Sequence, residues 1–289
     1  MPRSGLSPRQ IGAYRRSGFC APIDAFAQRE ALAMRRDFEA FEATLPPGPV
    51  APMFRRKLHV LLPWMRDVVG DSRILDAVED LIGPDILVFT STFFVKEPGT
   101  PTITAWHQDS TYLGLDHEHV SAWVAFSDAS ELAGCLRFVR GSHVRGQYRH
   151  TNQIVNDSLN VKGQAIARTF AGEEIVAAPL AQGQFSLHHT LVVHDSLPNR
   201  SADRRIGVSI SYIPTRVKHT GTMRLPATLV RGTDRLGHFD LEPDPRTVSG
   251  EEARIAHAAA FGRYREGYDQ QMEQVAAAVR EPFVGRQDS

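Results

Sequence analysis

Short runs of β-branched and aromatic residues dominate the chain from Pro84 onward, and they limit its possible folds most strongly. Glycine and proline residues separate the runs, as expected for turns between strands. Many short strands at this spacing are typical of a β-sandwich or barrel, including the jelly-roll class. The predicted strands lie at 86–95, 103–107, 120–128, 136–139, 183–189 and 206–213.

Helical patterns flank these strands on both sides. Ser7-Pro8 is a typical helix start and Gly18 a typical stop. An apolar stripe at helical spacing marks the segment DSRILDAVEDLIG. We therefore expect a mainly β fold with flanking helices, in a single domain spanning 1–289. Its predicted parts are N-terminal helices at about 8–83 (8–16, 26–45 and 71–83), a core of strands, sandwich or barrel, at about 84–232 and a C-terminal helix at about 249–280.

Composition narrows the class of protein. The formal net charge of zero argues against nucleic-acid and membrane partners. Two cysteines, Cys20 and Cys135, argue against a disulfide scaffold and against a cysteine-built zinc site. The sequence has no signal-peptide pattern and no apolar run of membrane-spanning length. We expect a soluble, cytoplasmic protein, and its oligomeric state stays open.

A histidine and an aspartate, His107 and Asp109, stand two residues apart at the end of a predicted strand. Alternate side chains of a strand share a face, so the two would project together. A neutral imidazole and a carboxylate suit a divalent first-row metal. The pair is a weak signal on its own, and two polar residues at a strand end are the alternative.

A second segment, 183–214, supplies three more histidines: His188, His189 and His194. A facial triad of two histidines and one carboxylate needs just one of them. Such a triad leaves positions open on the metal for a cosubstrate and for oxygen. The segment thereby strengthens the metal-site hypothesis, but it does not show which of the three histidines would be the second ligand.

An arginine pair follows, and the strand after it alternates in an unusual way. Arg205 shares its register with Gly207, Ser209 and Ser211, whereas the other register is apolar. A face with one cation and otherwise small residues favours a cavity. Arginine would suit a carboxylate-bearing cosubstrate, because its guanidinium binds carboxylates in a bidentate way. A solvent-facing strand with a surface arginine is the alternative.

Four stretches together resemble the phytanoyl-CoA dioxygenase family of non-haem iron, 2-oxoglutarate-dependent oxygenases. They are WHQD at 106–109, SAWVAFSDAS at 121–130, GCLRFVRGSHVRG at 134–146 and HDSLPNRSADRR at 194–205. The resemblance covers roughly 86–214. It implies a double-stranded β-helix, the cupin-like jelly roll, with a metal inside one open end of the barrel.

The resemblance also implies roles for individual residues. It assigns Fe(II) to His107, Asp109 and His194, and the far carboxylate of 2-oxoglutarate to Arg205. Ser196 would help to hold that carboxylate, and Trp123 would lie near the cosubstrate. Thr92 and Lys96 are further candidates for the cosubstrate or substrate wall. His188 and His189 are interpreted as polar residues near the cavity.

The implied reaction uses O2 and decarboxylates 2-oxoglutarate to succinate and CO2 while a C–H bond is hydroxylated. The substrate would be a small polar metabolite, an organophosphonate or a natural-product intermediate. Related halogenases lack the metal-binding carboxylate, so Asp109 argues against halogenation. Three alternatives remain: desaturation or ring formation by the same oxidant, a non-catalytic jelly-roll binding protein, and a zinc or manganese hydrolase on a cupin-like barrel.

The segment FRRKLH, 54–59, places several cations after a loop rich in proline and glycine. In the family this region approaches the mouth of the active site. A cationic wall would suit a carboxylate, phosphate or phosphonate, and a solvated loop is the alternative. Among these residues Lys57 and His59 are predicted to contact substrate, together with the more distant His238.

Overall fold

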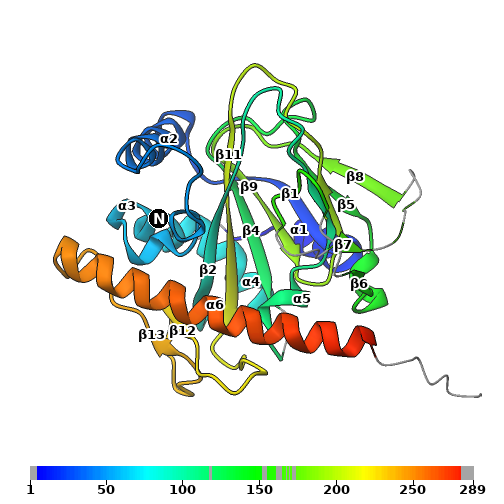
Figure 1. Cartoon of the computed structure of the whole chain (residues 1–289). Helices are drawn as coiled ribbons and strands as arrows, with labels where there is room; N and C mark the ends of the chain where they lie inside the picture. The colour runs from blue at the N-terminus through cyan, green and yellow to red at the C-terminus, as the bar shows by residue number, and fades with distance from the viewer. Residues whose placement is uncertain are drawn as a thin grey trace, which may run out of the picture.

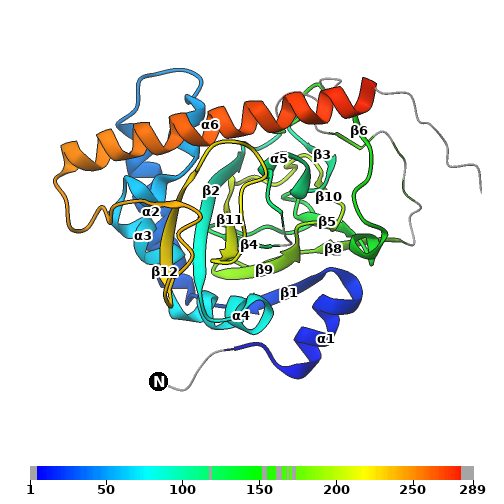
Figure 2. The same cartoon turned by 90° about the horizontal axis from the view of Figure 1, so that it is seen from below.

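Two β-sheets face each other at the centre of the computed structural model, which describes residues 5–116, 119–151, 155–160, 165–166, 168, 170 and 174–280. Figure 2 shows the facing sheets. The larger sheet has the order β1-β9-β4-β11-β2-β12-β13, and the smaller one β3-β10-β5-β8. The predicted mainly β jelly roll with flanking helices is confirmed.

The strands of the larger sheet are β1 (Phe19–Asp24), β2 (Ile86–Lys96), β4 (Val120–Ala125), β9 (Gln184–His189), β11 (Arg205–Pro214), β12 (Pro226–Arg231) and β13 (Asp240–Leu241). Those of the smaller sheet are β3 (Thr104–His107), β5 (Leu136–Val139), β8 (Ile175–Ala178) and β10 (His194–Ser196). A separate pair consists of β6 (His150–Thr151) and β7 (Ala165–Ile166). The sequence did not predict β1, β6, β7, β8, β10, β12 or β13.

The helices are α1 (Pro8–Ser17), α2 (Gln28–Ala43), α3 (Pro63–Val69), α4 (Ser72–Ile82), α5 (Ser110–Leu113) and α6 (Gly250–Arg280), with 3-10 turns η1 (Pro52–Arg55), η2 (Leu58–Val60) and η3 (Ser142–Arg145). The helix ends follow the sequence signals. Ser7 and Gln10 form a capping box at the start of α1, and Gly18 ends that helix with a φ of 83°. None of the helices in the described part of the chain is both long and apolar enough to cross a membrane.

Strand β11 separates the core from the interior of the barrel. Its apolar register, which includes Ile206, Val208 and Tyr212, packs outward against a core shared with α2, α3 and α4. Burial of each such side chain contributes about 1.5–3 kcal/mol. Since strand side chains alternate between faces, Arg205 and the small residues of the other register point into the barrel. This alternation leaves room for a cavity between the sheets.

The long helix α6 crosses one end of the barrel (Figure 1). Near its start, Nε2 of His257 lies 2.9 Å from the backbone oxygen of Arg56, beside η1. Further along, the amide of Gln271 donates to the backbone oxygen of Thr111 in α5 at 3.1 Å. Helix α6 therefore spans the barrel end from η1 to α5.

Candidate active site

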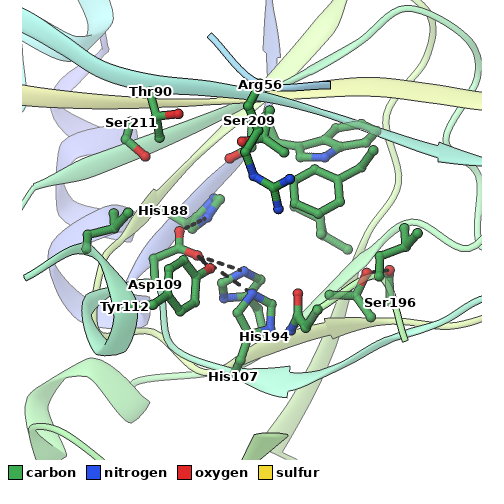
Figure 3. Close-up of a pocket in the computed structure, with 18 of the residues that line it drawn as sticks. Arg56, Thr90, His107, Asp109, Tyr112, His188, His194, Ser196, Ser209 and Ser211 are labelled. Carbon is green, nitrogen blue, oxygen red and sulfur yellow. Dashed lines mark hydrogen bonds and ion pairs between the residues drawn. The ribbon is translucent and has the colours of Figure 1, made fainter. Parts of the chain in front are cut away.

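Three buried side chains, His107, Asp109 and His194, converge in the cavity (Figure 3). Antiparallel pairing of β3 and β10 places His194 directly opposite His107. Oδ1 of Asp109 lies 3.6 Å from Nε2 of His107 and 3.8 Å from Nε2 of His194. Neighbouring ligands around a metal with bonds of about 2.1 Å lie about 3 Å apart. A small contraction therefore fits this donor set to a divalent first-row metal.

The route by which Asp109 reaches the cavity differs from the prediction. Strand β3 ends at His107, and Asp109 has helical φ and ψ angles of −63° and −33° before α5. The two residues therefore do not share a strand face, and the prediction of that geometry was wrong. The turn into α5 brings the carboxylate back beside His107. The Asp109 side chain makes no capping hydrogen bond to α5.

Backbone carbonyls fix the orientation of both imidazoles. Nδ1 of His107 donates to the oxygen of Ala105 at 2.8 Å, and Nδ1 of His194 to that of Val192 at 3.1 Å. Because Nδ1 then carries the proton, Nε2 presents its lone pair toward Asp109. Burial lowers the pKa of His107 and, more strongly, that of His194. Both rings are therefore neutral, as metal ligation requires.

Asp109 accepts hydrogen bonds from three residues, two of which, Tyr112 and Ser121, sequence reasoning missed. The hydroxyls of Tyr112 and Ser121 donate to its two oxygens at 2.6 Å each, and Nε2 of His188 lies 3.3 Å from Oδ2. Burial alone would raise the pKa of Asp109, but the His188 hydrogen bond and the electrostatic influence of the surrounding histidines hold it well below its usual value. Tyr112 follows Asp109 by three residues, the spacing of neighbours on a helical turn. Reading 109–113 as helix would have found it.

Arg205 lies on the opposite wall of the cavity and is almost completely buried, with 1% of its surface exposed. Its Nη1 donates to the oxygen of Gly134 at 2.8 Å, while Nε has no hydrogen-bond partner in the described structure. Burial lowers its pKa to about 10, so the side chain stays charged near neutral pH. A buried cation is costly unless it is paired. The site therefore fits an anion, such as the far carboxylate of 2-oxoglutarate.

Trp123 holds the arginine in place, and Gly207 makes space for the tryptophan. The guanidinium carbon of Arg205 lies 5.1 Å from the centre of the Trp123 ring. A Cβ atom at position 207 would lie 2.1 Å from Cζ2 of Trp123. The small residue expected on this face is thus required by a close approach of the indole ring.

We predict that Gly207→Ala weakens 2-oxoglutarate binding about tenfold or more. The added methyl group must displace the rigid indole, and the Arg205 guanidinium that rests on it moves as well. A charge-assisted hydrogen bond contributes roughly 1.5–3 kcal/mol, which corresponds to this loss. Calorimetric titration of the metal-loaded protein measures the effect. Gly262→Ala, at a position on α6 where an added Cβ atom would meet nothing within 4 Å, is the matched control and should retain the wild-type affinity.

The remaining predicted cosubstrate residues divide into two groups. Thr92 and Ser196 line the cavity with Arg205 and Trp123. Lys96 does not: its Nζ donates to Oγ of Ser196 at 2.7 Å and to the backbone oxygens of Ser196 and Leu197. Burial, then the charge of Arg205, lowers the pKa of Lys96 to about 6. The prediction for Lys96 is corrected: it lies behind Ser196 and supports it from outside the cavity.

The predicted substrate residues lie elsewhere. Nζ of Lys57 pairs with Oε1 of Glu242 at 2.8 Å, and Nε2 of His59 lies 3.4 Å from the other carboxylate oxygen. All three side chains are buried, on the far side of β2 from the cavity. His238 lies in the connection between β12 and β13, outside the cavity lining. The prediction that Lys57, His59 and His238 contact substrate is therefore corrected, because a buried carboxylate takes the first two.

The side chains of the two histidines that precede His194 point to opposite faces of β9. His188 points into the cavity beside Asp109 (Figure 3). His189, the next residue on β9, points to the opposite face, where its ring lies 5.1 Å from that of His143. The interpretation as polar residues near the cavity fits His188 alone.

The family model described as phytanoyl-CoA dioxygenase (PhyH) matches residues 14–207. This chain belongs to the phytanoyl-CoA dioxygenase family. Membership confirms the predicted class of enzyme, the non-haem Fe(II)/2-oxoglutarate oxygenases, and the predicted cofactors of that class.

The chain is also similar to curated proteins whose names give different substrates. The 1-deoxypentalenic acid 11-beta-hydroxylase of Streptomyces arenae is 30% identical over 145 residues, which covers 47% of this chain and 51% of the relative. A probable alpha-ketoglutarate-dependent hypophosphite dioxygenase of Stutzerimonas stutzeri is 26% identical over 193 residues, 63% of this chain and 65% of the relative. The chain thus spans between about half and two thirds of these curated relatives.

One solved structure is similar to this chain over nearly the whole length of both. The apo form of a non-haem monooxygenase, ThoJ, has a TM-score of 0.80 and 31% identity, covering 91% of this chain and 98% of that one. A nickel complex of ThoJ has a TM-score of 0.75. The phytanoyl-CoA dioxygenase fold described above is therefore shared with a metal-binding relative.

Proposed function

We propose that this protein, as one oxygenase domain over 1–289, hydroxylates a C–H bond of a small molecule in an Fe(II)- and 2-oxoglutarate-dependent reaction. The overall balance is one substrate, one 2-oxoglutarate and one O2 giving the alcohol, succinate and CO2. The observation that carries the proposal is the presence of two features in one cavity: the His107–Asp109–His194 donor set and the buried Arg205. A hydrolytic metal site has no need of the second feature.

The side chains divide the work between the two walls. Nε2 of His107, Nε2 of His194 and a carboxylate oxygen of Asp109 would hold Fe(II), which when bound supplies the oxidation chemistry. Arg205 would pair with the far carboxylate of 2-oxoglutarate, and the Ser196 hydroxyl lies on the same wall to assist. Asp109 stays ionised because His188, Tyr112 and Ser121 donate to it.

The substrate we propose is a small acidic or polar molecule. Two relatives are named for acids of quite different size, a pentalenic acid derivative and hypophosphite. The zero net charge offers no general attraction for nucleic acid or membranes. The cytoplasmic location and the absence of such partners stay predictions from composition.

Succinate formation tests this function. Purified protein loaded anaerobically with Fe(II) is supplied with 2-oxoglutarate and O2, with and without a panel of small carboxylic acids, phosphonates and hypophosphite. We expect succinate to rise with one member, together with an equal amount of oxidised product. Binding of metal and 2-oxoglutarate with no succinate from any member would support the non-catalytic binding protein instead.

Arg205→Gln should raise the 2-oxoglutarate concentration for half-maximal turnover by about ten- to a hundredfold. The variant loses a charge-assisted pair that contributes roughly 1.5–3 kcal/mol. The matched control is Arg204→Gln, because Arg204 points away and pairs with Glu42 and Glu97. A control that loses affinity equally, or an unchanged Arg205 variant, would contradict the assignment of the cosubstrate to Arg205.

A further inference from the structure

The cavity opens onto a second hollow at the protein surface, between η1 and α6. The two share the side chains of Arg56, Tyr264 and Tyr268. The inner cavity offers about 70 Å³ of free space and the outer hollow about 410 Å³. If the proposed function holds, 2-oxoglutarate occupies the inner cavity. Most of a substrate must then lie in the outer hollow, with its reacting carbon alone reaching inward.

Arg56 is the member of the predicted cationic segment that faces both spaces. Arg55 is held by Glu42 at 2.6 Å, and Lys57 and His59 by the buried Glu242. Arg56 has no ion pair with any carboxylate in the part of the chain that the structure describes. The cationic wall expected from the sequence is therefore a single half-buried guanidinium, which hydrogen-bonds the neutral Tyr264 hydroxyl and still lacks a counter-charge among the described residues.

The backbone on both sides of Arg56 is fixed by long-range contacts. Its carbonyl accepts from His257 on α6, and its neighbour Lys57 donates its amide to Ser91 of β2 at 2.8 Å. Lys57 has a φ of 54°, in the left-handed region, and its side chain is fixed by Glu242. An anchored backbone presents the guanidinium with little ordering cost on binding.

The surroundings of Arg56 suit an oxyanion with an apolar body. On the inner side it shares a wall with the hydroxyls of Thr90, Ser209 and Ser211, opposite His107 and His194 (Figure 3). The hydroxyl of Thr90 lies within hydrogen-bonding reach of the Tyr264 hydroxyl, so the two groups stand together at this wall. The outer hollow adds apolar and aromatic side chains, namely Pro52, Met53, Phe261, Tyr264 and Tyr268.

We propose that Arg56 binds an oxyanion of the substrate, a carboxylate or a phosphate, at the junction of the two spaces. The apolar part of the substrate lies in the outer hollow against η1 and α6. Arg56 and Arg205 then bind different anions: Arg56 binds the oxyanion of the substrate, and Arg205 binds the far carboxylate of 2-oxoglutarate. The inference rests on the proposed function for the reaction, but the binding site itself is testable without turnover.

The test uses two fluorescent probes of one shape. 1-Anilinonaphthalene-8-sulfonate carries an oxyanion on an aromatic body, and N-phenyl-1-naphthylamine is the same body without it. Both are titrated into the wild type, Arg56→Gln, Arg56→Lys and Arg265→Gln. Arg265 is the matched control, since it lines the same outer hollow but lies 3.8 Å from Asp269.

We expect Arg56→Gln to weaken binding of the sulfonate about tenfold and to leave the neutral probe unchanged, as loss of a charge-assisted hydrogen bond requires. Arg56→Lys should restore part of the affinity, and Arg265→Gln should change neither probe more than about twofold. Equal losses for both probes would assign Arg56 a purely structural role. Equal effects at Arg56 and Arg265 would indicate general electrostatic attraction. Either result, or no effect of Arg56→Gln, would overturn the proposal.

A separate measurement keeps this proposal distinct from the proposed function. The 2-oxoglutarate affinity of the same metal-loaded proteins is determined by calorimetry without O2. We expect Arg56→Gln to leave it unchanged and Arg205→Gln to lower it. Absence of 2-oxoglutarate binding in the wild type would reject the function while the probe results stand. A loss of 2-oxoglutarate affinity in Arg56→Gln but not in Arg205→Gln would assign Arg56 to the cosubstrate and reject the substrate site.

Discussion

Asp109→Ala is expected to abolish tight metal binding and, with it, succinate formation. The change removes the anionic member of the donor set and the acceptor for Tyr112, Ser121 and His188. Removal of a residue that merely supports a metal ligand typically costs 10–100-fold in affinity. Loss of the ligand itself should exceed about 100-fold. Calorimetric titration with Ni(II), a redox-stable substitute for iron, measures the affinity.

Two further variants separate metal loss from misfolding. Asp109→Asn keeps the shape and an acceptor oxygen but removes the charge, so it should fold and still bind metal poorly. Asp67→Asn changes an aspartate on the protein surface, 63% exposed, and should bind metal as the wild type does. Wild-type affinity in folded Asp109→Ala would reject the donor set.

The second large effect is on stability. Glu242→Gln should lower the free energy of unfolding by about 3–5 kcal/mol, because it leaves the ammonium of Lys57 buried without its counter-charge. The side chains of Lys57 and Glu242 are 0% and 2% exposed, so water cannot replace the missing partner. Urea unfolding followed by circular dichroism gives the value.

The double variant Lys57→Met with Glu242→Leu is the matched control. Replacing a buried ion pair by apolar residues of similar volume is often close to neutral. The double variant should therefore recover much of the stability that Glu242→Gln loses. If the free energy of unfolding of Glu242→Gln stays within about 1 kcal/mol of the wild-type value, Lys57 and Glu242 do not form a buried ion pair.

The same carboxylate predicts a pH dependence. Burial acts to raise the pKa of Glu242, but the charge of Lys57 and the contact with His59 outweigh it and lower the pKa to about 2. In the unfolded chain a glutamate has a pKa of about 4.3. The stabilisation is thus complete above about pH 4.5 and is lost as the pH falls toward 2. Glu242→Gln should show a shallower loss of stability than the wild type over that interval.

The local sequence pattern predicted the features that depend on adjacent residues. It did not predict features that depend on contacts between residues far apart in the chain. The register of β11 could be read directly, since Arg205, Gly207 and Ser209 differ so clearly from their apolar neighbours. The helix ends at Ser7 and Gly18 were equally readable, because capping depends on adjacent residues.

The cationic segment 54–59 shows what local sequence could not predict. Three consecutive cations, Arg55 to Lys57, look equivalent in sequence, yet the side chain of each has different surroundings in the fold. Arg55 meets Glu42, Lys57 meets Glu242, and Arg56 is left to the cavity. The partners come from far along the chain, so no local pattern shows which cation they neutralise. The expectation that Asp109 shares a strand face with His107 was wrong for a local reason, because the turn into α5 ends the strand alternation after His107.

The residues that line the cavity come from two different parts of the fold. Every residue proposed to hold metal or 2-oxoglutarate comes from the strands or from the turn into α5, whereas Arg56, Tyr264 and Tyr268 come from η1 and α6 outside the barrel. Tyr264 and Tyr268 are spaced by one helical turn, so neighbouring positions on that face of α6 can change without altering a strand. Such a chain can acquire a new substrate by mutations along a single helix while its oxidising centre is inherited intact. Libraries for altered selectivity should therefore be concentrated on α6 and η1.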